Sequence, residues 1–123
     1  MEIVYSSKKV EKQCTSVKEA NKLFGGNKQL TTSLMSRINA IKQAETIMDI
    51  IAMPTFHFHK LNNKGKKKLE GYFAIDVKSR NHPWRIILEP LDKNKNPFKL
   101  YNIDEIGPHV RIVKIMEVSK HYE

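Results

Sequence analysis

The spacing of the apolar residues changes near the middle of the chain. The first half carries apolar residues at intervals of four, four and three: Leu30, Leu34, Ile38 and Ile41. This spacing places them on one stripe of a helix. In the second half, aromatic and β-branched residues cluster in short, partly alternating segments that are typical of strands: 56–60, 72–77, 84–89 and 110–118. Helices followed by mostly antiparallel strands predict an α+β domain.

Local signals set the expected boundaries of the helices. Ser16 and Glu19 have the spacing of a capping box, so a helix is expected to begin there and to end at Gly25-Gly26. Thr46 is expected to cap a further short helix that ends before Pro54. The first half therefore predicts two helices packed as a hairpin, followed by a short third.

The remaining segments are expected to be connections, one short strand and one helix or turn. Residues 2–5 alternate enough for a strand, and the polar segment 6–13 fits a helix or a turn. Segments 62–68, 79–83 and 91–108 carry the Asn, Gly, Pro and Lys residues of turns and exposed loops.

Length and charge indicate one domain with a polyanionic partner. The chain of 123 residues is the size of a single domain, 1–123, and its 22 Lys and Arg against 13 Asp and Glu give a net charge of +9. That charge favours nucleic acid as the partner. A single cysteine, Cys14, excludes an intramolecular disulfide framework. With no secretory signal at its start and no long apolar run, the chain is expected to be cytoplasmic and not bound to a membrane.

A lysine-rich segment, 60–68, is the first candidate site. Several cations on one loop suit binding to phosphates, whereas the alternative is a solvated hairpin tip that protects an edge strand. The side chains that we expect to bind RNA are Lys60, Lys64, Lys68, Arg80 and Lys120.

Arg85 is the second candidate, because it lies between Trp84 and Ile86 in a strand pattern. Alternation sends Arg85 to the face opposite its two neighbours. On a concave sheet surface its guanidinium would bind a phosphate in a bidentate manner and stabilise charge on a pentacovalent phosphorus. On the solvated face of the sheet it would be a surface cation. Trp84 is expected to lie in the core rather than to stack on a base.

Histidines supply the third set of candidates. His121 and Tyr122 follow the last strand, where a histidine is able to transfer a proton to or from an RNA hydroxyl and a tyrosine to donate or orient one; a frayed terminus is the alternative. His57 and His59 would share one side of a strand, but without a third ligand nearby they favour contact with solvent or RNA over a metal. Serine, cysteine and paired-carboxylate catalytic patterns and Walker loops are absent, so neither metal nor cofactor is expected.

Taken together in this order, several segments resemble the HigB toxins of the RelE/ParE superfamily. The matching segments are 20–24 before a glycine-containing loop, 33–41 in a long helix, Pro54, 71–77, 84–86 and the last strand with its His-Tyr end. The resemblance covers nearly the full chain. It implies a RelE-like fold, with an N-terminal helical hairpin packed on a mostly antiparallel sheet.

The resemblance also implies a metal-free endoribonuclease that cuts mRNA on the ribosome with the RNA 2′-hydroxyl as nucleophile. Arg85 matches the phosphate-stabilising arginine of the family. His121 and Tyr122 fall on its terminal acid-base residues in swapped order, after Lys120 where the family has an acid. The catalytic lysine of the family falls in segment 60–68, where Lys66 and Lys67 are the best placed.

The family further implies a HigA-like helix-turn-helix antitoxin as partner, with operator DNA contacted only through the antitoxin complex. It also implies that the protein acts at the decoding site of the small ribosomal subunit. Two alternatives stay open: a non-enzymatic inhibitor of gyrase similar to ParE, and a basic RNA-binding module. Likeness of fold does not decide between them.

Overall fold

The protein contains a mixed β-sheet covered on one face by helices. The structure is a computed structural model that describes residues 1–62, 69–99 and 101–120. Over these residues the sheet has five strands in the order β1-β5-β4-β3-β2. The strands are β1 (Glu2–Tyr5), β2 (His59–Lys60), β3 (Phe73–Asp76), β4 (Arg85–Leu91) and β5 (Ile112–Ser119). Strand β1 is parallel to β5 and the other pairs are antiparallel, which confirms the predicted α+β class and the mostly antiparallel sheet.

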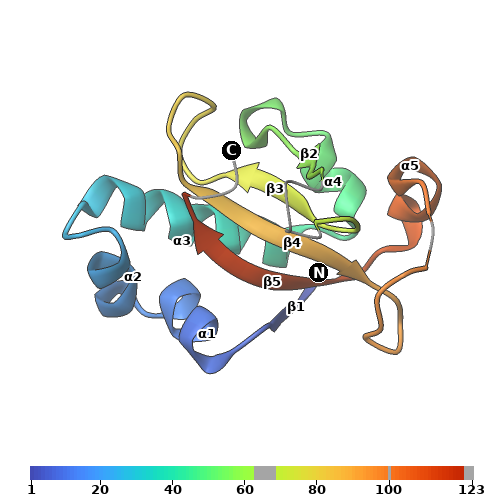
Figure 1. Ribbon diagram of the computed structural model, residues 1–123, viewed down its shortest axis with the longest axis horizontal. Coiled ribbons are helices and arrows are strands. Elements are labelled where there is room, and N and C mark those ends of the chain that lie inside the picture. Colours follow the sequence, from blue (N-terminus) through green and yellow to red (C-terminus); the bar gives the residue numbers. More distant parts are fainter. Residues whose placement is uncertain (63–68, 100, 121–123) are drawn as a thin grey trace.

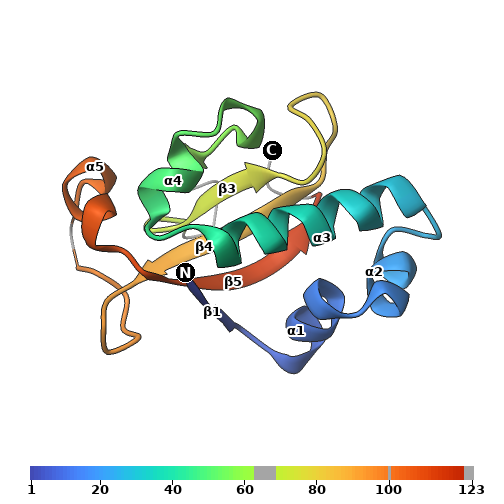
Figure 2. The ribbon, with the colours of Figure 1, turned by 180° about the vertical axis from the view of Figure 1, so that it is seen from behind.

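Helices α1 to α4 lie between β1 and β2 in the chain, and one short helix, α5, lies between β4 and β5. They are α1 (Lys8–Thr15), α2 (Val17–Leu23), α3 (Lys28–Gln43), α4 (Ile47–Ile51) and α5 (Ile103–Ile106). Figure 2 shows α3 lying across β4 and β5, whereas Figure 1 shows the opposite face of the same strands, which no helix in the described part of the chain crosses. No helix in the described ranges is both long and apolar enough to cross a bilayer.

The helix boundaries follow the predicted capping signals. The Ser16 hydroxyl accepts a hydrogen bond from the Glu19 backbone N–H (3.3 Å), and Thr46 and Asp49 form a capping box at the start of α4. Gly25 and Gly26 end α2 with φ values of 62° and 88°, a region that glycine reaches without strain. Helices α2 and α3 are thus the predicted hairpin.

The predicted stripe of α3 forms the centre of the core. Leu34 and Ile41 are fully buried, and Leu30 and Ile38 nearly so. They belong to one cluster with apolar residues of the covered sheet face: Ile75, Val77, Ile86, Leu88, Val113, Ile115 and Val118. Burial of this stripe, rather than intrinsic propensity, supplies most of the stability of such a helix.

Segment 6–13, expected to be a helix or a turn, is largely helical and forms most of α1, which is followed by Ser16, the N-cap of α2. Two other expectations about local structure need correction. The predicted strand 56–60 is shorter, because Pro54–Phe56 is a 3₁₀ turn and only His59–Lys60 pairs with β3. The expected loop 91–108 contains α5 and a 3₁₀ turn at Gly107–His109.

Cys14 gives a simple test of this packing. Its side chain is 1% exposed, and burial raises the pKa of its thiol to about 12. Because the thiolate is the reactive form, we expect no reaction with an aromatic disulfide reagent at about pH 8 in the native protein, and full reaction in guanidinium chloride. Rapid reaction of the native protein would show that the side of α1 that carries Cys14 is not packed against the core.

Candidate active site

Three polar residues form a row on the sheet face opposite α3, at one end of the sheet. The register pairs Asp76 of β3 with Arg85 of β4, and Arg85 with Ser119 of β5. Residues paired in register point to the same face of a sheet. Ser119 leads directly into Lys120, so the chain that follows β5 starts beside Arg85.

Asp76 lies at the β3 end of this row and is 0% exposed. Its Oδ1 lies 3.2 Å from Nε of Arg85 and 3.4 Å from Nδ1 of His57. Its Oδ2 has no hydrogen-bond partner in the part of the chain that the structure describes. A buried carboxylate is stable only when cations and donors compensate it, so Arg85 is needed to hold Asp76 in place.

Arg85 is itself 5% exposed and is fixed by backbone oxygens. Its guanidinium donates to the carbonyl oxygens of Arg80 and Trp84, both at 3.0 Å, and to that of His82. With the Asp76 contact, these bonds occupy at least four of its five N–H donors.

This placement changes what was expected of Arg85. The alternative of a solvated surface cation is wrong. A bidentate contact with a phosphate needs two free N–H donors, so Arg85 cannot form it in this arrangement. A catalytic role for Arg85 stays a prediction, and the contacts make it a residue that positions Asp76 and the turn at 79–84.

Trp84 packs against the core, as predicted. Its ring is half-buried and meets the edge of Phe24 with centroids 4.9 Å apart. The ammonium of Lys120 lies 5.7 Å from the centre of the Trp84 ring, a distance that permits a cation–π interaction.

His57 is the accessible member of the cluster, with 31% of its side chain exposed. Its backbone is left-handed (φ 49°) at the end of the 3₁₀ turn, which lets its ring reach back to Asp76. Because a carboxylate only accepts, Nδ1 carries the proton in the neutral ring and Nε2 is left as a base. A histidine oriented by a buried carboxylate in this way suits proton transfer.

His59 extends the site along the edge of the sheet. Its ring stacks on that of His57 with centroids 4.5 Å apart, and its Nδ1 lies 2.7 Å from the His57 carbonyl oxygen. Within residues 1–62, 69–99 and 101–120, no three His, Cys, Asp or Glu side chains are arranged to hold a metal ion.

Sequence patterns missed Asp76, the His57 contact and Arg37. Arg37 lies outside the apolar stripe of α3, yet its Nε donates to the Asp76 carbonyl oxygen (3.0 Å) and its guanidinium lies 4.2 Å from the centre of the Phe56 ring. Burial lowers the pKa of Arg37, and the Asp76 charge opposes that shift. A single Asp in the apolar run 73–77 was the available signal.

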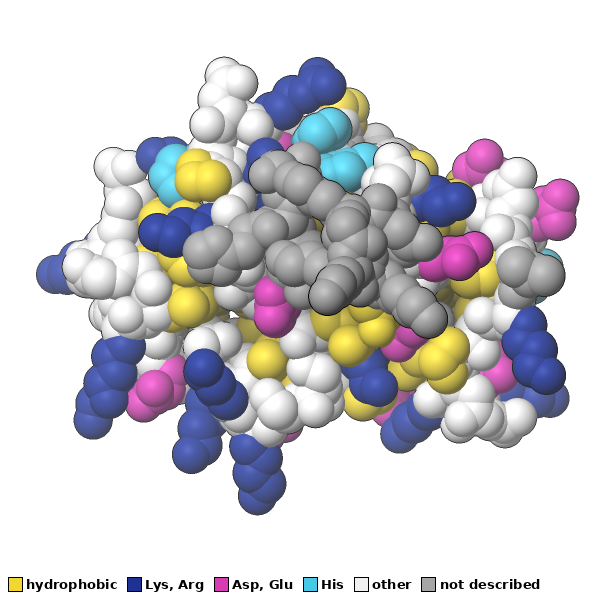
Figure 3. Space-filling view, in the orientation of Figure 1, with side chains coloured by type: hydrophobic (Ala, Val, Ile, Leu, Met, Phe, Trp, Pro, Cys, Tyr) yellow, Lys and Arg dark blue, Asp and Glu magenta, His cyan; other side chains and the backbone are white. Residues whose placement is uncertain are grey.

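The other predicted site residues are distributed around this row or lie outside the described residues. Arg80 and Lys120 are exposed beside the row, and Lys60 is exposed in β2. Figure 3 shows His, Lys and Arg side chains on the side of the molecule that faces the viewer in Figure 1. The candidates outside the described residues are Lys64, Lys66, Lys67, Lys68, His121 and Tyr122.

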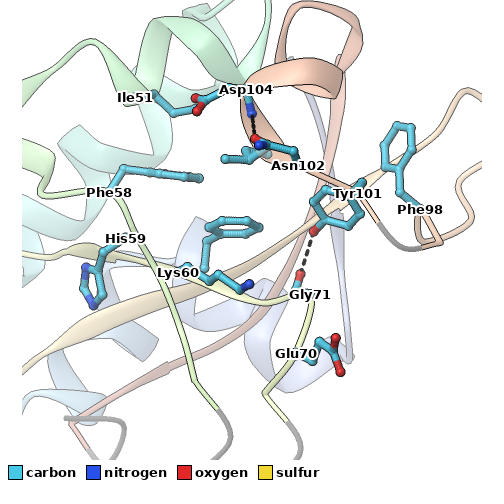
Figure 4. Close-up of a pocket in the computed structure, with 12 residues that line it drawn as sticks. Ile51, Phe58, His59, Lys60, Glu70, Gly71, Phe98, Tyr101, Asn102 and Asp104 are labelled. Carbon is cyan, nitrogen blue, oxygen red and sulfur yellow. Dashed lines mark hydrogen bonds between the residues drawn. The ribbon is translucent and has the colours of Figure 1, made fainter.

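A groove of about 820 Å³ opens at the β2 edge of the sheet, next to His59. Figure 4 shows Phe58, Phe98 and Tyr101 around it, with the Tyr101 hydroxyl donating to the Gly71 carbonyl oxygen at 3.2 Å. Phe98 and Tyr101 come from segment 91–108, which the sequence had suggested was an exposed loop.

No family model, no curated protein and no solved structure matches this chain. The functional argument therefore depends on the residues and their geometry.

Proposed function

We propose that this protein is a metal-independent endoribonuclease with a RelE-like fold, and that it acts as the toxin of a type II toxin-antitoxin system by cutting mRNA on the ribosome. The observation that carries the proposal is His57: its Nδ1 faces the buried Asp76–Arg85 pair and its side chain is partly exposed. This is the arrangement of a general base.

The proposed reaction needs no group beyond RNA and the protein. Nε2 of His57 takes the proton of a 2′-hydroxyl, whose oxygen attacks the adjacent phosphorus while the bond from phosphorus to the 5′-oxygen breaks. A second group returns a proton to the leaving 5′-oxygen, and His121 or Tyr122 is the predicted donor. The products are a 2′,3′-cyclic phosphate and a 5′-hydroxyl.

Charge supports RNA as the substrate. The chain has a net charge of +9, and exposed Arg80 and Lys120 adjoin the row that holds Asp76 and Arg85. Cations around a site raise the local concentration of a polyanion and make binding sensitive to salt. In the same proposal a HigA-like antitoxin restrains the toxin in the cytoplasm, and operator DNA is bound only through that complex.

The test is to map the 5′ ends of an mRNA by primer extension after the pure protein is added to translating ribosomes. We expect new ends that require ribosomes and carry a 5′-hydroxyl, with a 2′,3′-cyclic phosphate on the upstream fragment. A ribosome-free reaction is the control. Intact mRNA with inhibition of gyrase supercoiling, or with salt-sensitive RNA binding alone, would overturn the proposal.

A further inference from the structure

The groove at the β2 edge is built mainly from aromatic rings. Phe58 and Phe73 stack with centroids 4.9 Å apart, Phe73 lies 6.4 Å from Tyr101, and Tyr101 lies 5.8 Å from Phe98. Phe73 is buried and forms the floor, whereas Phe58, Phe98 and Tyr101 are half-buried and line the opening. Such partly exposed rings provide flat faces on which a planar ligand can stack.

The groove lies next to the candidate active site. His59 belongs to the groove lining, and its ring also stacks on that of His57, which contacts Asp76. A ligand that occupies the groove and extends past His59 would reach the proposed base. A single-stranded nucleic acid has this form, since a base and the phosphate beside it are linked by one sugar.

The polar groups at the rim suit a nucleotide better than an apolar side chain. Exposed Lys60 supplies a cation for a phosphate. Asp104 and Asn102 are exposed at the same opening, with the Asn102 side-chain oxygen accepting from the Asp104 backbone N–H at 2.9 Å. Carboxylates and amides at such positions pair with the exocyclic amino groups and ring nitrogens of bases.

We propose that this aromatic groove binds an unpaired base of single-stranded RNA and so selects which nucleotide lies next to His57. The inference rests on the proposed nuclease function, because it names the substrate feature that the same site reads. Stacking on Phe98 and Tyr101 provides the affinity, and the rim groups distinguish among the bases.

The experiment measures binding of 2′-O-methyl oligoribonucleotides of about six nucleotides by fluorescence anisotropy; they lack the nucleophilic hydroxyl and are not cut. We expect Phe98→Leu and Tyr101→Leu to weaken binding about tenfold, and Phe98→Trp to retain it. Phe98→Leu keeps an apolar side chain and removes only the ring. It therefore separates stacking of a base from docking of an apolar peptide, which would tolerate leucine.

Two controls accompany these variants. Val17→Ala shortens an exposed apolar side chain on α2, outside the groove lining, and is expected to bind as the wild type does. The fluorescence of Trp84, the only tryptophan of the natural chain, reports that the leucine and alanine variants are folded, since Trp84 packs on Phe24 and does not line the groove. Circular dichroism serves for Phe98→Trp, which adds a second tryptophan.

The outcomes separate this inference from the proposed function. Equal binding of wild type and Phe98→Leu, or equal binding of an oligomer whose sugars lack bases, would overturn the groove proposal even if the protein cuts mRNA. Binding that depends on Phe98 and on the bases, with no cleavage by the wild type, would support the groove and overturn the nuclease.

Discussion

Replacement of Arg85 by alanine is expected to lower the free energy of unfolding by about 3–5 kcal/mol. The change leaves the fully buried Asp76 without the guanidinium that lies 3.2 Å from its Oδ1, and it removes the donors that hold the turn at 79–84. An uncompensated buried charge is among the most destabilising features in a protein. Urea unfolding followed by Trp84 fluorescence measures the loss.

The chain offers a matched control for this prediction. Arg111 forms an ion pair with Glu45 at 3.4 Å, but both side chains are exposed. Because water screens such a pair, Arg111→Ala is expected to cost about 0–1 kcal/mol. A double variant, Asp76→Asn with Arg85→Met, should recover part of the Arg85→Ala loss, since it removes the buried charge. Equal losses for Arg85→Ala and Arg111→Ala would contradict the structural role of the buried pair.

The same contacts affect how cleavage by an Arg85 variant is interpreted. Loss of activity in Arg85→Ala would reflect misplacement of Asp76 and the turn at 79–84 as well as any direct contact with RNA. His57 is the better test of chemistry, because its side chain is partly exposed and its removal leaves the Asp76–Arg85 pair in place.

His57→Asn is expected to reduce the rate of mRNA cleavage by about 10²–10⁴-fold, the usual contribution of a general base. Asparagine tolerates the left-handed backbone (φ 49°) at this position, so the fold should be retained. Quantified primer-extension products over time give the rate, and the urea midpoint verifies stability.

His109→Asn is the matched control for His57→Asn, because His109 is exposed in the 3₁₀ turn after α5 and takes no part in the site. It is expected to cut as the wild type does. If His57→Asn cuts mRNA at the wild-type rate, His57 is not the general base. Proton transfer would then be assigned to groups outside the described residues.

Sequence patterns predicted those parts of the fold that local chemistry determines. The α3 stripe and the caps at Ser16 and Thr46 are periodic or short-range signals, and the structure confirms them. The first part of the predicted strand 56–60 was wrong, because the course of residues 56–58 depends on the 3₁₀ turn that starts at Pro54 and on the contact between His57 and Asp76. Tertiary contacts determine the conformation of such segments, and the local sequence gives little indication of those contacts.

The candidate site was predicted only in part for a similar reason. Arg85 stood out because it is a cation in an apolar strand. The other members come from residues far apart in the chain, with Arg37 on α3, His57 after a 3₁₀ turn and Asp76 on β3. Strand register and the packing of α3 bring them together, and neither is encoded in local spacing. A lone buried Asp is informative only once its neighbours are known.

The parallel pairing of β1 with β5 also constrains the order of events during synthesis. The two strands lie at opposite ends of the described chain, and the Ser6 hydroxyl that donates to the Met116 carbonyl oxygen is separated from it by 110 residues. The nascent helices can form early, but β1 has no partner until β5 has left the ribosome. Contacts of such separation slow folding. The row of Asp76, Arg85 and Ser119 therefore assembles late, so an unfinished chain carries no completed site.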